Sequence, residues 1–80
     1  MKANREYELS VHRGGRGPAM LAGPERVDHV EVVEIATGEV ALFWDTRPSQ
    51  TRRLARGLRA DLAQLEADAF IAKWRRWQVA

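Results

Sequence analysis

The chain has 80 residues, which fit a single domain over residues 1–80, and 45% of them are hydrophobic. Because a disordered chain needs few aliphatic and aromatic residues and a large net charge, this composition predicts a folded domain. A chain of this length buries only about 60% of the surface that its unfolded form exposes, so a partner subunit would add to a marginal stability. The absence of cysteine excludes disulfides and thiolate metal sites.

Charge is distributed unevenly along the chain. Residues 1–47 carry six basic and eight acidic residues, net −2, whereas residues 48–80 carry seven and three, net +4. Arginine outnumbers lysine 11 to 2, which we interpret as the coding bias of a GC-rich bacterial genome. Neither a signal peptide nor the roughly 20 apolar residues of a membrane span is present, so we expect a cytoplasmic protein with no membrane partner.

The first periodic segment predicts a strand. Tyr7, Leu9 and Val11 alternate with polar residues, the period-2 pattern of a strand with one buried face, and we expect it at about 5–12. Residues 13–26 contain four glycines and two prolines and predict a loop.

Two further β-prone runs surround a Thr-Gly turn and predict a hairpin, with strands at about 27–36 and 39–45. In the first run the alternation slips at Val32 and Val33. A bulge there would restore it, or the strand is covered on both faces.

The rest of the chain predicts a helix at about 48–77, with Thr46 or Ser49 as its cap. Gly57 costs this helix about 1 kcal/mol against alanine, and would allow a close approach or mark a slight bend. The predicted fold class is α+β, a three-stranded antiparallel sheet with one long C-terminal helix packed on it in β-β-β-α order. The helix face that packs on the sheet is a stripe made of Leu54, Leu58, Leu62, Leu65, Ala69 and Ala72.

Such a helix would be about 45 Å long, whereas a seven-residue strand spans about 23 Å. Its C-terminal half must therefore overhang, turn back after a break, or pack on something else. Phe70, Trp74 and Trp77 share a helix face displaced from the leucine stripe. They either cover the chain's own core or form the interface of a homodimer or of a complex with another protein, and we favour the interface.

Further up the helix, the same angular face carries Arg52, Arg56 and Arg59. They are either solvated side chains or a cationic ridge that meets phosphate, or that meets Glu31 and Glu34 of a second subunit.

Residues suited to chemistry are few. His12 and His29 are the only histidines, and His29 and Glu31 share a strand face without a third metal ligand nearby. The segment HRGGRGP could form a backbone nest for an anion, although a flexible connection is the simpler interpretation. No motif places a nucleophile such as Ser10 or Ser49 beside a base. We expect no enzyme activity, no cofactor and no metal.

The segment TGEVALFWDTRPSQTRRLARGL resembles the last strand and helix start of two groups of DNA-binding domains, the plant ethylene-response domains and the arm-binding domains of tyrosine integrases. The resemblance covers about a quarter of the chain and implies a sheet that enters the major groove. The corresponding surface here carries Asp28, Glu31, Glu34 and Glu39, which phosphate would repel. The strand-turn-strand-helix outline is also similar to the amino-terminal oligomerisation domains of actinobacterial DNA-bridging proteins.

The sequence thus predicts a small protein-interaction module that forms a homodimer or binds another protein through the distal helix, led by Phe70, Trp74 and Trp77. The alternative is a nucleic-acid-binding protein, whose affinity would fall steeply as salt rises. It would use the cations Arg52, Arg53, Arg56, Arg59, Lys73, Arg75 and Arg76.

Overall fold

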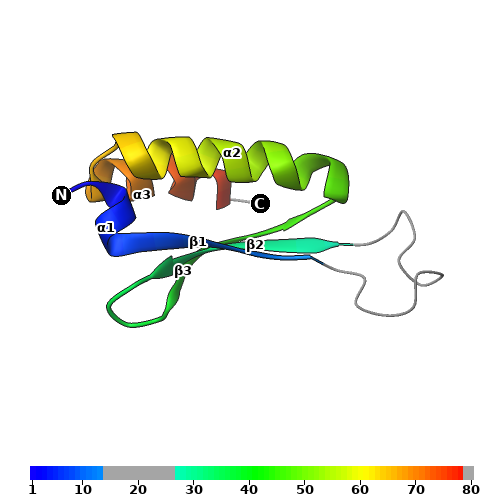
Figure 1. The fold of residues 1–80 in the computed structure, drawn as a ribbon, viewed down its shortest axis with the longest axis horizontal. Coiled ribbons are helices and arrows are strands. Elements are labelled where there is room, and N and C mark those ends of the chain that lie inside the picture. The colour runs from blue at the N-terminus through cyan, green and yellow to red at the C-terminus, as the bar shows by residue number, and fades with distance from the viewer. Residues whose placement is uncertain (14–26, 79–80) are drawn as a thin grey trace.

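A three-stranded antiparallel sheet forms one layer of the molecule, and the helices pack against one of its faces (Figure 1). The computed structural model describes residues 1–13 and 27–78, so most of the expected loop 13–26, with its HRGGRGP segment, lies outside the described residues. The sheet has the order β1-β2-β3 and confirms the predicted α+β class. The first elements are a short helix α1 (Ala3–Glu6) and the strands β1 (Tyr7–His12), β2 (Asp28–Glu34) and β3 (Val40–Thr46).

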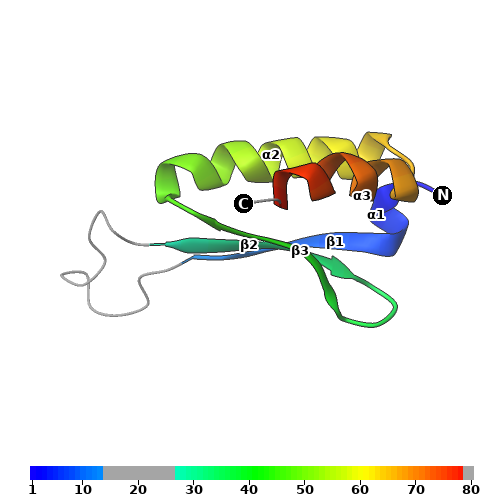
Figure 2. The same cartoon turned by 180° about the vertical axis from the view of Figure 1, so that it is seen from behind.

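The C-terminal part of the chain forms two helices, and the prediction of one long helix is wrong. These elements are α2 (Pro48–Gln64), α3 (Ala67–Arg75) and the 3-10 turn η2 (Arg76–Gln78). α2 has 17 residues and is about 26 Å long, close to the length of the strands beneath it. Leu65 and Glu66 then adopt extended backbone, with ψ of 154° and 156°. α3 runs back beside α2 (Figure 2), so the helix turns back after a break.

The start of the chain stabilises this break. Lys2 pairs with Glu66 in an isolated antiparallel bridge, and the Ala3 N–H donates to Leu65 O at 2.9 Å. The Lys2 ammonium donates to Gln64 O at 2.9 Å. Because the last carbonyls of a helix have no partner within it, these contacts supply bonds that the end of α2 would otherwise lack.

The core lies between the sheet and the helices. Its buried residues are Ala3, Val30, Val32, Leu42, Leu58, Leu62 and Phe70. The predicted stripe on the helix holds as far as Leu65, which is half-buried, but Ala69 and Ala72 are exposed. They are exposed because α3 has turned away from the direction that a continuous helix would follow.

A bulge interrupts the pairing of β2 with β3. Val32 lies opposite Leu42 and Val33 lies opposite Val40, which leaves Ala41 as an extra residue on β3. Of the two explanations for the slipped alternation at Val32 and Val33, the structure shows the bulge. The hairpin turn contains Gly38 at a φ of 76°, a conformation that glycine adopts without steric cost.

Candidate functional site

The predicted interface residues Phe70, Trp74 and Trp77 do not form one surface. Phe70 is 0% exposed and lies in the chain's own core, with its ring stacked 6.1 Å from the ring of Tyr7. Burial also raises the pKa of the Tyr7 hydroxyl. Trp74 is half-buried, and Trp77 is 67% exposed. Because the turn before α3 directs Phe70 into the core, only the two tryptophans remain accessible to a partner.

A groove of about 870 Å³ lies between β3, α2 and the end of the helical segment. Trp44, Trp74 and Trp77 line it with indole rings, while Arg53 and Asp45 bring opposite charges to it. Its other lining residues are Thr46, Ser49, Gln50, Leu54 and Gly57. A groove of this size and aromatic content matches the sites that hold small ligands or a few side chains of a peptide. We call it the tryptophan groove.

Contacts from β3 and α2 hold Trp74 in place. Its ring meets Trp44 edge-on, with centroids 6.0 Å apart, and its Nε1 donates to Asp61 Oδ2 at 2.9 Å. Lys73 Nζ lies 2.6 Å from the same carboxylate oxygen. A Cβ on Gly57 would lie 3.4 Å from Trp74 Cη2, so the indole packs directly against the bare backbone of α2. Gly57 therefore permits a close approach, to an indole rather than to a strand.

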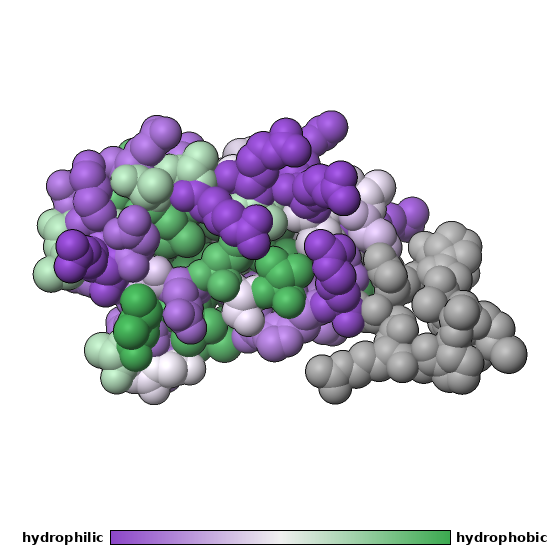
Figure 3. Space-filling model, in the orientation of Figure 1, coloured by the Kyte–Doolittle hydropathy of each residue, from purple (hydrophilic) through white to green (hydrophobic). Residues whose placement is uncertain are grey.

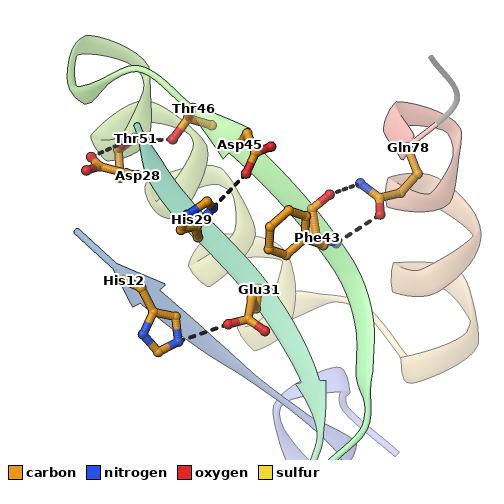
Figure 4. A network of polar contacts seen from close by, with 9 residues as sticks. All are labelled: His12, Asp28, His29, Glu31, Phe43, Asp45, Thr46, Thr51 and Gln78. Atoms are coloured by element: carbon orange, nitrogen blue, oxygen red, sulfur yellow. Dashed lines mark hydrogen bonds and ion pairs between the residues drawn. The ribbon is translucent and has the colours of Figure 1, made fainter. Parts of the chain in front are cut away.

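Gln78 anchors the end of η2 beside β3 (Figure 4). Its Oε1 accepts from the Phe43 N–H at 2.9 Å, and its Nε2 donates to Phe43 O at 2.6 Å. These are the two bonds that a residue of a neighbouring strand would make. The anchor places Trp77 at the edge of the groove, with its ring 6.4 Å from that of Trp74.

The candidate nucleic-acid contacts lie on the other side of α2. Arg52, Arg56 and Arg59 are all exposed. At about 100° per residue, Arg52 and Arg59 project opposite to the groove residues Gln50 and Gly57, whereas Arg56 projects outward between the two sides of α2. Within residues 1–13 and 27–78, none of them forms an ion pair. Figure 3 shows hydrophilic side chains along α2 above a strip of apolar side chains between α2 and β1. We call these three residues the arginine ridge; Arg53 is separate and lines the groove.

Two histidine–carboxylate pairs lie on the face of the sheet away from the helices (Figure 4). His12 Nε2 is 2.9 Å from Glu31 Oε1, and His29 Nδ1 is 2.6 Å from Asp45 Oδ1. Ser10 Oγ is 3.0 Å from the same Nε2 of His12. A serine–histidine–acid relay uses both ring nitrogens, so this arrangement is not one. His29 and Glu31, the two residues that the sequence places on one strand face, contact different partners. The described residues include no group of three that could hold a metal ion.

A buried polar cluster joins α2 to the sheet. Thr51 Oγ1 lies 2.7 Å from Asp28 Oδ2 and 2.7 Å from Thr46 Oγ1 (Figure 4). Asp28, predicted to lie on the acidic surface, is 0% exposed. The expected cap at Thr46 or Ser49 is also wrong, because α2 begins after Arg47 and Thr46 is used in this cluster.

Sequence reasoning missed Trp44 and Gln78. Trp44 has the same strand parity as Leu42, which is fully buried, so its side chain had to point towards the helices. That signal was present in the sequence. Gln78 carries no local signal, because its role depends on the return of α3 to β3.

Comparison with known proteins finds no family model, no curated protein and no solved structure that matches the chain. In the part of the chain that the structure describes, the helices lack the length and apolar character needed to cross a bilayer.

Proposed function

We propose that the protein is a small interaction module that binds a segment of a partner protein in the tryptophan groove. The observation that carries this proposal is Trp77, which is 67% exposed beside Trp74. Covering a large apolar side chain gains on the order of 1.5–3 kcal/mol, and tryptophan is enriched among the residues that dominate binding. Because other contacts already hold Trp74, a ligand would gain this free energy without ordering the groove first.

The groove favours an extended, proline-rich segment. Trp74 is the one tryptophan whose indole N–H donates to a described residue, which leaves the N–H groups of Trp44 and Trp77 for a ligand. Arg53 adds a further donor. Aromatic grooves with such donors suit polyproline segments, which present apolar rings and free carbonyls at a low entropic cost.

Calorimetric titration with a proline-rich peptide of about ten residues tests the proposal. We expect Trp77→Ala to weaken binding about tenfold or more, because it removes the exposed wall of the groove. Phe43→Ala is the control, since Phe43 is 43% exposed but does not line the groove, and its affinity should equal that of the parent. Equal affinities of all three proteins would exclude the groove as the site.

A second copy of the chain is the other occupant to test. Light scattering over a concentration series reports the oligomeric state, and peptide binding to a monomer is the expected result. A dimer that dissociates on Trp77→Ala and ignores the peptide would replace the proposal with self-association.

The arginine ridge favours a second candidate function, nucleic-acid binding. Arg52, Arg56 and Arg59 are exposed without carboxylate partners among the described residues, as phosphate contacts require. Anisotropy of a labelled single-stranded oligonucleotide would then show affinity that falls steeply with salt. Loss of Arg56 and Arg59 together would reduce both the affinity and the salt dependence.

A further inference from the structure

The outer edge of β1 presents backbone groups without partners. β2 pairs with β1 through its odd-numbered residues, a pattern that continues in the bond from the Ile35 N–H to Glu6 O. Since backbone direction alternates along a strand, the N–H and C=O groups of Tyr7, Leu9 and Val11 point away from β2. The Tyr7 N–H donates to Ala3 O at the end of α1, whereas the N–H and C=O groups of Leu9 and Val11 make no hydrogen bond to any residue that the structure describes.

At the opposite edge of the sheet, outward backbone groups have a hydrogen-bond partner. On β3, Gln78 bonds both backbone groups of Phe43. No side chain performs that task for β1 within the described residues. An open strand edge is a template on which another strand can pair, and edge pairing is a common way of binding an extended peptide.

The arginine ridge overhangs this open edge. The tryptophan groove lies on the β3 side of α2, so the opposite side, which carries Arg52 and Arg59, faces the β1 side, and Arg56 projects outward beside them. Between α2 and β1 lies the apolar strip of Figure 3. Leu9 and Val11 of β1 are half-buried and pack against the core. The site thus combines three features: the open backbone edge of β1, the apolar strip, and the positively charged arginine ridge.

We infer that an extended acidic segment of a partner protein adds to the sheet antiparallel to β1, beneath the arginine ridge. A second copy of this chain does not fit, because two-fold pairing of β1 strands would bring two arginine ridges together. A nucleic acid would satisfy the ridge but would leave the strand edge and the apolar strip unused. An acidic strand uses the open edge through its backbone and the arginines through its carboxylates, while the methylene groups of the same acidic side chains lie against the apolar strip.

The pairing geometry dictates where the acidic residues stand. In an antiparallel pair, the residue opposite Leu9 exchanges both backbone hydrogen bonds with it, and its side chain lies on the same face of the sheet. That is the face covered by α2 and the arginine ridge. Acidic residues are therefore expected at alternate positions, opposite Leu9 and Val11. The intervening residues lie beside Ser10 and His12 and suit β-branched side chains.

Peptides that alternate glutamate with valine test strand addition directly. An end-blocked peptide of about eight residues spans the edge of β1, and calorimetry measures its affinity. N-methylation of the glutamates removes the N–H groups that face β1 and should abolish binding, whereas N-methylation of the valines should leave it intact. Equal binding of the two methylated peptides would overturn strand addition.

Charge reversal on the protein tests whether the arginine ridge contacts the acidic peptide. Arg59→Glu should weaken binding of the glutamate peptide about tenfold, while Arg53→Glu, the same change on the groove side, should leave it unchanged. Far-UV circular dichroism of both variants checks the fold. A single-stranded RNA that binds this surface while the peptide does not would overturn the inference.

Discussion

The two long sides of α2 differ in how firmly their side chains are held. On the groove side, Gly57 and Asp61 pack against and bond to Trp74, a residue of another helix. On the ridge side, Arg56 and its neighbours are exposed and form no ion pair with the described residues. One helix can therefore offer a partner a fixed aromatic surface on one side and exposed positive charges on the other. Substitutions on the groove side should change folding and binding together, whereas those on the ridge should change binding alone.

Of the substitutions considered, Phe70→Ala should lower the free energy of unfolding most. Phe70 is 0% exposed and holds α3 against the sheet, so its loss should lower the free energy of unfolding by about 3–5 kcal/mol. That is much of the total stability of a domain of this size. Urea denaturation followed by circular dichroism measures it. Trp77→Ala is the matched control at an exposed aromatic and should lower the free energy of unfolding by less than about 1 kcal/mol. Equal losses in the two variants would mean that Phe70 and Trp77 contribute equally to stability.

Two substitutions at Gly57 test whether the close contact of its backbone with the Trp74 ring requires glycine. Gly57→Leu forces atoms into the space of the Trp74 ring and should lower the free energy of unfolding by about 1–3 kcal/mol, as overpacking does. Gly57→Ala places a Cβ 3.4 Å from the ring, an ordinary contact, and should raise stability by up to about 1 kcal/mol because alanine favours the helix. Urea denaturation of both variants gives these values. Destabilisation by alanine would show that the indole requires glycine.

The sheet could be predicted because its signals are local. Alternation in β1, the Thr-Gly turn and the slip at Val32 and Val33 each depend on residues that are neighbours in sequence. The break between α2 and α3 could not be predicted, since neither Leu65 nor Glu66 disfavours a helix as proline or glycine would. Bonds from the start of the chain, including one from Lys2 to a residue 62 positions away, stabilise it.

The candidate site was also predictable only where it depends on residues that are neighbours in sequence. Trp74 and Trp77 were identified from the composition of the last helix, but Phe70 was grouped with them because a single straight helix places all three on one face. The break changed which of them a partner can reach. Only the length comparison between helix and sheet, which requires a break, an overhang or a partner, indicated that such a change was possible.

Arg56→Ala combined with Arg59→Ala should leave folding almost unchanged, in contrast to the groove side. Both side chains are exposed without ion pairs to the described residues, so the free energy of unfolding should change by less than about 0.5 kcal/mol. Urea denaturation in low and high salt measures the change. A clear gain in stability at low salt would show that the arginines repel one another in the folded state.

Glu66→Gln should give the smallest effect, and its pH dependence identifies the cause. The hydrogen bond and charge of the Met1 amino group lower the pKa of Glu66, and Glu66 raises the pKa of that amino group. The lowered carboxyl pKa contributes stability above its ordinary value of 4.5, and the raised amino pKa contributes stability below its ordinary value of 8.0. Their pairing therefore acts between these two values, and it fades as acid protonates Glu66 or alkali deprotonates Met1. Because both groups are exposed, the difference between parent and variant should be slight. Urea midpoints at about pH 3, 6.5 and 10 should differ between the two proteins only at the middle pH. A difference that persists unchanged at all three would mean that Glu66 supports the helix break through its side-chain packing and not through its charge.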